Sequence, residues 1–215
     1  MKNLSKLFFA LACIALTTTV TSCLDDDDEY KDDNYKEISN VERQIMKEAL
    51  QGVYEGEMRV TAPYTLKTDT TACSWRVMHN DSTFRSTSFP FAAFSNMLSN
   101  EEDKNILKQA EPQELLLYYT TPNTVYLPNY QLGIYEYNFK VPTEYKYTVD
   151  THQVTVEFAS FINVTDSWGQ PFVFVSSCQY KNKDIVGQLI VSSITIDDKV
   201  YKVQNIVTFT GKKVE

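Results

Sequence analysis

The chain has 215 residues and a formal net charge of −8. Its 14 tyrosines, 12 phenylalanines and only 6 glycines favour β-strands and argue against a loop-rich protein that cradles phosphate. Residues 38–215 hold 20 acidic and 16 basic side chains and no basic patch, so nucleic acid is not expected as a partner.

The first residues of the chain have the pattern of a bacterial lipoprotein signal. A lysine-bearing start precedes the apolar run 7–16, which is too short to span a bilayer. Residues 20–23, with the sequence VTSC, match the lipobox. We therefore expect residues 1–22 to be a signal peptide and Cys23 to be the lipidated, membrane-anchored start of the mature chain. The alternative is an ordinary signal peptide with a chance cysteine.

An acidic block, residues 25–29, follows the lipobox directly. It resembles the export signal that Bacteroidetes-type lipoproteins carry after the lipidated cysteine, which directs them to the outer face of the outer membrane. A block of like charges is also typical of a solvated tether. We expect residues 23–38 to be the lipidated acidic tether of an outer-membrane lipoprotein that faces the cell exterior. Residues 39–215 are then expected to form a single β-rich domain.

Two short helices are expected. Each begins with a serine that is followed three residues later by a glutamate, the pattern of a capping box. Apolar side chains then recur at helical spacing, in the first helix Val41, Ile45, Met46, Ala49 and Leu50. The helices are predicted over residues 40–51 and 99–110, with Ser39 and Ser99 as N-caps.

The rest of the chain predicts strands with period-2 alternation, many of them separated by turn residues. We expect a mainly β fold, an antiparallel meander that closes as a lipocalin-like barrel or stacks as a two-sheet sandwich. The sequence does not decide between the two. The side chains expected in the core are Tyr137, Phe139, Phe158, Phe174 and Phe209. The predicted strands cover residues 53–60, 73–78, 82–87, 114–120, 132–141, 145–149, 154–162, 172–180, 187–196 and 199–210.

Three features together carry a family resemblance. They are the acidic block after the lipobox, the segment GVYEG at 52–56 after the first helix, and FPF at 89–91 before a helix that interrupts the strands. The layout resembles a group of uncharacterised lipoproteins of gut Bacteroidetes with lipocalin-like (calycin-like) β-rich domains. The resemblance implies the same fold. It carries over no functional residue except Cys23.

The sequence contains no recognisable catalytic or cofactor motif. The only histidines, His79 and His152, have no metal-ligand spacing, and no GxSxG or nucleotide-binding loop occurs. We therefore assign no catalytic residue, no metal site and no cofactor. A glycosidase pair would need two carboxylates across a cleft. The acidic residues on or near strands that could supply one are Glu136, Glu144, Asp150 and Glu157, and their default is a solvated face.

Aromatic side chains near polar loops are the remaining signal. Trp168, Tyr126 and Tyr130 are the candidate ligand contacts, because they combine aromatic faces with neighbouring polar groups between strands. The alternative for Trp168 is a ring folded over the barrel end. Cys73 and Cys178 are either a disulfide or two separate buried thiols.

These observations predict a lipid-anchored, non-enzymatic binding protein of the cell surface. Its partner would be a small apolar or glycan ligand, or another protein. The alternatives are a structural or accessory subunit of an outer-membrane complex and a glycan-acting hydrolase. An enclosed apolar pocket inside a barrel would favour the ligand-binding function, whereas an interior filled by side chains would argue against a small ligand of either kind.

Overall fold

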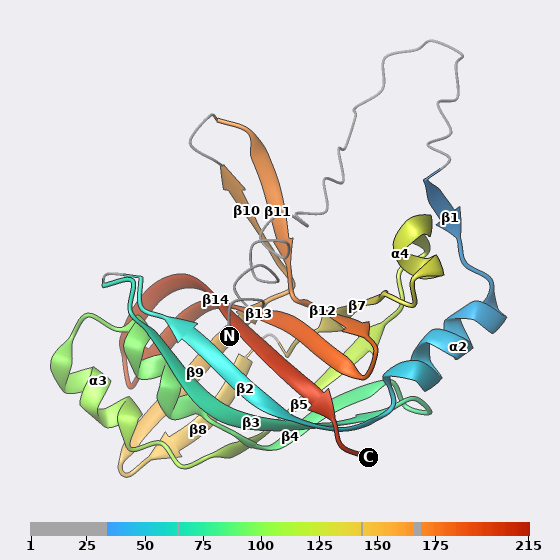
Figure 1. Cartoon of the computed structure of the whole chain (residues 1–215). Helices are drawn as coiled ribbons and strands as arrows, with labels where there is room; N and C mark the ends of the chain where they lie inside the picture. Colours follow the sequence, from blue (N-terminus) through green and yellow to red (C-terminus); the bar gives the residue numbers. More distant parts are fainter. Residues whose placement is uncertain (1–33, 64, 143, 166–168) are drawn as a thin grey trace.

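The computed structural model describes residues 34–63, 65–142, 144–165 and 169–215 (Figure 1). The expected signal peptide, Cys23, the acidic block and Trp168 lie outside these residues. None of the described helices is long and apolar enough to cross a membrane.

The structure is a closed, eight-stranded antiparallel barrel, which decides between the two expected architectures. Its strands follow one another in the order β12-β7-β5-β4-β3-β2-β14-β13, and β12 pairs again with β13 to close the ring. The bounds are β2 (Gly52–Thr61), β3 (Thr68–Met78), β4 (Thr83–Phe89), β5 (Gln113–Thr120), β7 (Tyr135–Lys140), β12 (Ser177–Lys181), β13 (Asp184–Ile196) and β14 (Lys199–Lys213).

The long strand β13 pairs with two different strands along one of its edges. Its first part pairs with β12, from Asp184 to Gln188, and its last part pairs with β9 (His152–Ala159), which in turn pairs with β8 (Glu144–Val149). A register shift between Val191 and Ser193 marks a bulge within the part that pairs with β9. Bulges increase the local twist of a strand, so β13 leaves the closed ring and carries β8 and β9 as an extension.

Two of the predicted strands are each broken at a serine. The segments expected over 154–162 and 172–180 divide at Ser160 and Ser176, and the residues between leave the barrel as a separate hairpin of β10 (Phe161–Thr165) and β11 (Pro171–Val175). Ser176 is fully buried. Its hydroxyl donates to the Ala159 carbonyl at 2.8 Å, and its backbone N–H donates to Ser160 at 2.8 Å. These bonds replace the regular ladder, which apolar periodicity alone does not reveal.

The first helix is confirmed, but not its buried face. Helix α2 (Asn40–Leu50) begins at the capping box of Ser39 and Glu42, and it buries Met46 and Leu50. Val41 and Ile45 were expected on the same face, yet their side chains are 71% and 47% exposed. The apolar contact of the helix with the barrel end comes from its C-terminal half, so the apolar residues of its first turns stay in solvent.

The second helix, α3 (Glu101–Lys108), begins one residue later than the capping-box pattern predicts. Its N-cap is Asn100 and not Ser99, because the Asn100 side chain accepts from the Asp103 backbone N–H at 3.0 Å. Two helical segments were not expected. They are the 3₁₀ helix η1 (Phe91–Met97) and the five-residue α4 (Leu127–Gln131), both too short to show a helical period.

The folded part of the chain begins before residue 39. Residues 35–37, which were expected in the tether, form β1 (Tyr35–Glu37) and pair antiparallel with β6 (Thr124–Tyr126). In the pair Tyr35 and Tyr126, the ring centroids lie 5.6 Å apart. The last part of the expected tether is therefore attached to the domain.

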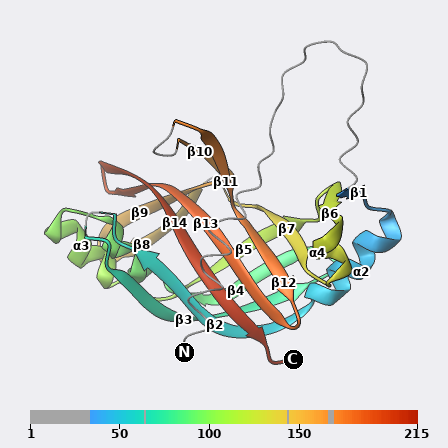
Figure 2. The same ribbon diagram turned by 45° about the horizontal axis from the view of Figure 1, so that its top comes forward.

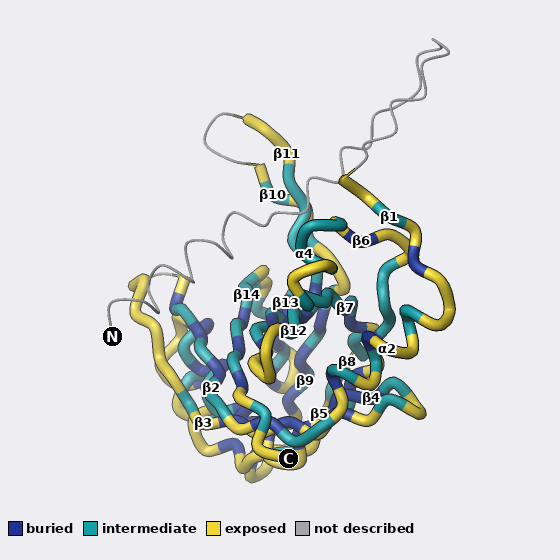
Figure 3. The backbone as a smooth tube through the Cα atoms, turned by 45° about the vertical axis from the view of Figure 1, so that its right-hand side comes forward, coloured by how far each residue is buried: buried dark blue, intermediate teal, exposed yellow. Residues whose placement is uncertain are grey.

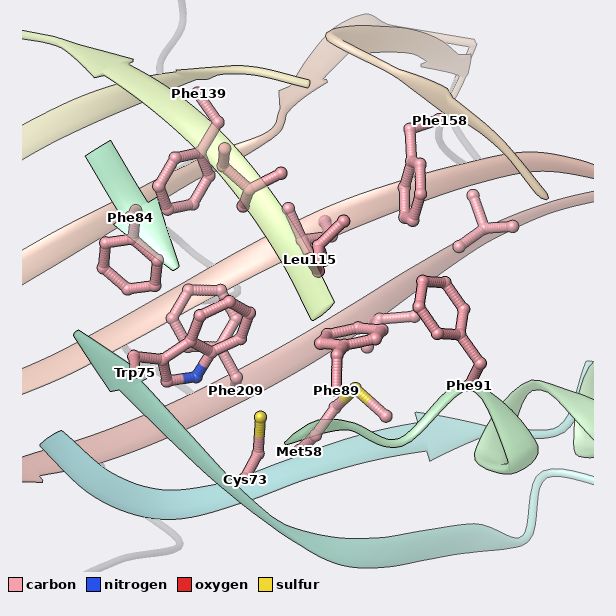
Figure 4. Close-up of a cluster of buried hydrophobic side chains, with 14 of the residues drawn as sticks. Met58, Cys73, Trp75, Phe84, Phe89, Phe91, Leu115, Phe139, Phe158 and Phe209 are labelled. Carbon is pink, nitrogen blue, oxygen red and sulfur yellow. The ribbon is translucent and has the colours of Figure 1, made fainter. Parts of the chain in front are cut away.

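Aromatic rings fill the middle of the barrel (Figure 4). The centroid of Trp75 lies 4.8 Å from that of Phe84 and 5.0 Å from that of Phe209, and Phe84 lies 5.1 Å from Phe139. Of the five predicted core residues, Tyr137, Phe139, Phe158 and Phe209 are buried. Phe174 is only half-buried, because it belongs to the projecting hairpin.

Cys73 and Cys178 are separate buried thiols, so the disulfide alternative is wrong. They lie on β3 and β12, which are not neighbours in the barrel. Burial raises the pKa of the Cys73 thiol to about 11 and raises the pKa of the Cys178 thiol further. Both therefore behave as small apolar side chains.

Candidate functional site

An open groove of about 1010 Å³ lies between α2 and the strand ends next to it. Its walls come from the outer side of α2, the β3–β4 turn, the end of β5 with the loop after it, and the outer face of β7. The lining residues are Asn40, Arg43, Gln44, Lys47, Asp81, Ser82, Tyr118, Tyr119, Thr120, Thr121, Pro122, Asn123, Asn138 and Lys140.

Hydrogen bonds from the barrel fix α2 as one wall of the groove. The buried hydroxyls of Tyr54 and Tyr137 donate to the carbonyls of Leu50 and Met46, each at 2.5 Å. The Leu50 carbonyl at the end of the helix has no partner within the helix, so the bond from Tyr54 satisfies a group that would otherwise be buried unpaired. The helix thus closes one end of the barrel, while α3 lies at the other end (Figures 1 and 2).

The opposite wall is held to α2 by two cations. The Arg43 guanidinium donates to Pro122 O at 2.9 Å and to Thr121 Oγ1 at 3.2 Å. The Lys47 ammonium donates to Ser82 Oγ at 2.9 Å. Both bonds join residues far apart in the sequence, so the groove is a product of the tertiary structure. Its shape is set before any ligand arrives.

The groove concentrates positive charge on an acidic protein. Three cationic side chains, Arg43, Lys47 and Lys140, line it against the single carboxylate of Asp81. That carboxylate is already used, because it accepts from the Thr83 hydroxyl at 2.7 Å and from the Thr83 backbone N–H. Lys140 is exposed and forms no ion pair within the described residues. The local excess of positive charge favours an anionic ligand.

The exposed ring of Tyr118 lies beside the ammonium-bearing side chain of Lys140. Tyr118 on β5 is 50% exposed and is the register partner of Lys140 on β7. Side chains directly opposite in an antiparallel pair have Cβ atoms about 4.5–5.5 Å apart. Amide side chains of Asn40, Gln44, Asn123 and Asn138 also line the groove. A flat ring, a cation and several amides can together hold a polar ligand that carries both hydroxyl and acidic groups.

The aromatic residues singled out from the sequence lie elsewhere. Tyr126 ends β6 with its ring tilted against that of Tyr35, while Tyr130 lies in α4 with its ring 5.5 Å from that of Tyr135. The Lys36 ammonium lies 5.5 Å above the Tyr130 ring. Neither tyrosine lines the groove. Trp168 lies outside the described residues, so its proposed contact with a ligand stays a prediction.

The carboxylates considered for a hydrolase each have another partner or lie on an outer face. Glu136 is half-buried on β7 and accepts from Gln179 at 3.3 Å, and burial raises its pKa. Glu157 accepts from Ser193 Oγ at 2.6 Å, and Glu144 pairs with Lys146 at 2.6 Å. Within the described residues, no group of three or more His, Cys, Asp or Glu side chains could hold a metal ion.

Sequence reasoning missed the groove because its residues are scattered over four separate segments. Arg43 and Lys47 lie in the predicted first helix and Tyr118 lies in the predicted strand 114–120, so no local pattern groups them. One signal was present: Tyr118 and Lys140 occupy polar phases of strands whose other phase is strongly apolar. A tyrosine on the polar phase of a predicted strand is therefore a signal that could have identified Tyr118 as a candidate contact.

Comparison with known proteins adds a family but no activity. Residues 49–196 match the family described as Domain of unknown function (DUF4840). No curated protein matches the chain significantly. The match runs from the end of α2 to the end of β13 and covers more than half of the chain. The chain therefore belongs to the DUF4840 family.

Proposed function

We propose that this protein is a lipid-anchored, non-enzymatic binding protein of the outer cell surface that holds an acidic glycan in the groove beside α2. The observation that carries the proposal is the combination of exposed Tyr118, preformed cationic walls, and Lys140, which has no ion-pair partner among the described residues. The lipobox ending at Cys23 and the acidic block 25–29 support the location.

The filled barrel argues against the expectation of a small ligand, apolar or glycan, held inside the barrel. The rings of Trp75, Phe84 and Phe209 occupy the middle of the interior within 5.7 Å of one another. A lipid-like ligand at that level would have to displace them, at the cost of a well-packed core. An external groove needs no such rearrangement. The polar lining fits the hydroxyl-rich surface of a sugar chain, and the cations fit its carboxylates or sulfates.

The test uses the lipidated protein in detergent and isothermal titration calorimetry with two matched probes. One probe is a hexamer of galacturonic acid and the other is the neutral galactose hexamer. The acidic hexamer should bind, the neutral one should bind much more weakly, and added salt should weaken the acidic hexamer most. Equal binding of both hexamers, or binding of neither, contradicts the proposal.

Two variants assign the binding to the groove. Lys140→Gln should weaken binding of the acidic hexamer about tenfold, since a hydrogen bond to a charged group contributes ~1.5 kcal/mol or more. Tyr118→Ala should weaken it as well by removing the stacking face. The matched control is Lys108→Gln, an exposed lysine on α3 at the other end of the barrel. If Lys108→Gln weakens binding as much as Lys140→Gln, the groove is not the site.

A further inference from the structure

The hairpin of β10 and β11 has an entirely apolar face. Register pairs place Ile162 opposite Phe174 and Val164 opposite Phe172, and alternate residues of a strand share a face, so these four side chains lie together. The rings of Phe172 and Phe174 are 5.1 Å apart. On the other face, Phe161 is 58% exposed. Neither strand contains a charged residue.

The hairpin stands apart from the barrel but is firmly held at its base. It forms a two-stranded sheet of its own, and Figures 1, 2 and 3 show it projecting from the ring. The Ile190 backbone N–H donates to Ser176 Oγ at 3.1 Å, and Gln188 Nε2 donates to Val175 O at 2.7 Å. An isolated two-stranded hairpin is only marginally stable in water. The hairpin therefore presents an apolar face outside the barrel on a fixed base, and this face is available for contact with a partner.

The hairpin rises from the side of the molecule where the described chain begins. All three views place β1, which starts at Tyr35, on the same side as β10 and β11, with β3 on the opposite side (Figures 1, 2 and 3). Cys23 precedes residue 34 by eleven positions. Even a fully extended chain of that length spans at most ~40 Å. A lipid on Cys23 would therefore keep this side close to the membrane.

We propose that the β10–β11 hairpin is a second membrane contact, which inserts its apolar face into the lipid interface and fixes the orientation of the barrel. The proposal rests on the lipid anchor of the proposed function. The occupant is a lipid surface because an apolar face on two strands without charged residues suits the acyl boundary, where apolar faces bury themselves ~5–10 Å deep. The exposed pair Tyr35 and Tyr126 lies on the same side, and tyrosine is typical of the membrane–water interface.

The experiment measures the depth of one position on each side of the protein. Thr165→Cys on β10 and Ser74→Cys on β3 are matched, because both replace an exposed hydroxyl residue. Each variant is lipidated, labelled with an environment-sensitive fluorophore and reconstituted in vesicles of phosphatidylethanolamine with brominated acyl chains. Cys73 and Cys178 are buried and do not take up the label in the folded protein. The label at Thr165 should be quenched strongly, and the label at Ser74 should not.

A further variant shows whether the apolar face drives the insertion. Phe172→Ser combined with Phe174→Ser, in the Thr165→Cys background, should reduce quenching to the level at Ser74 while the protein stays on the vesicles. If the protein floats with the vesicles but the label at Thr165→Cys is not quenched, the membrane contact of the hairpin is overturned and the lipid anchor is not. A protein that lacks acyl mass at Cys23 and does not float overturns the anchor itself. Thr165→Cys copies that cross-link to each other instead of being quenched would assign the hairpin to a second copy of the chain, and overturn the membrane contact.

Discussion

At the scale of single residues, the start of α2 depends on one carboxylate. Glu42 accepts from the Ser39 backbone N–H at 2.9 Å and from the Ser39 hydroxyl at 2.8 Å, and it also pairs with Lys36. These bonds, that to Lys36 first, lower the pKa of Glu42 to about 2. One carboxylate therefore connects β1, the N-cap and the helix.

Acid should release this connection. The folded pKa of Glu42 lies below the unfolded value of ~4.3, so its bonds contribute stability above about pH 4.3 that is lost as the pH falls toward 2. Glu42→Gln should lower the melting temperature at pH 7, and the difference from wild type should vanish near pH 2. Thermal unfolding by circular dichroism measures this. Glu48→Gln on the same helix is the control, and an equal pH profile for both variants would refute the role of Glu42.

Another residue-scale feature is a ring packed onto a glycine. Gly187 on β13 is the register partner of Phe209 on β14, and a Cβ at Gly187 would lie 2.2 Å from Cζ of that ring. Any side chain at this position therefore collides with the centre of the core. The glycine makes room for the ring that fills the barrel.

Gly187→Ala should destabilise the protein by about 1–3 kcal/mol, as overpacking does. Phe209→Leu should also destabilise it, through lost packing, but the double variant should be more stable than the sum of the two effects predicts, because the smaller side chain removes the collision. Chemical denaturation of the four proteins gives the coupling free energy. Strict additivity would show that the alanine is accommodated in another way.

At the scale of elements, α2 attaches to the barrel through its second half. Met46 and Leu50 are fully buried, and their carbonyls accept from the tyrosines of β7 and β2. The first turns are held through polar groups instead, chiefly Arg43. Helix α2 therefore covers one end of the core with its apolar side chains and forms a polar wall of the groove with its outer side chains.

Two adjacent apolar residues of α2 should contribute very differently to the free energy of unfolding. Met46→Ala should cost about 2–5 kcal/mol because it leaves a cavity under the helix. Ile45→Ala, at a side chain that is 47% exposed, should cost about 0.5 kcal/mol or less. Urea denaturation compares the two. Similar losses at both positions would mean that the outer side of α2 is covered in solution.

At the scale of the whole molecule, the fold is a barrel closed around a solid aromatic interior. Helix α2 closes one end, and η1 with α3 lies at the other, where Phe91 packs on Tyr145 at 4.6 Å and on Phe94 at 5.6 Å. The β10–β11 hairpin and the β1–β6 pair form separate two-stranded sheets outside the ring. Both binding surfaces that we propose lie outside the barrel interior.

Opening the interior should be possible only by removing a ring. Trp75→Ala should destabilise the protein by about 3–5 kcal/mol. The cavity left is apolar, so benzene should bind there and raise the melting temperature of the variant by mass action, while leaving wild type unchanged. Differential scanning calorimetry with and without benzene makes the comparison. Equal stabilisation of wild type would reveal a cavity that is already open.

The elements were largely predictable, because local chemistry specifies them. The capping box at Ser39 and the alternation at Tyr137 and Phe139 depend on neighbours within a few residues, and both are confirmed. The breaks at Ser160 and Ser176 were not predictable. At Ser176 the hydroxyl donates to a carbonyl of β9 and accepts from a backbone N–H of β13. These bonds join segments that are separated in the sequence and meet only in the folded barrel.

The candidate site was not predictable for the same reason. The sequence by itself determined a mainly β domain, its apolar faces and the expectation of a lipid at Cys23, because signals, periodicity and caps are local. Tertiary structure alone decided that the sheet closes, that its interior is full, and that Arg43, Tyr118 and Lys140 meet in one groove. Pairing between distant strands sets these outcomes, and no local pattern encodes which strand lies beside which.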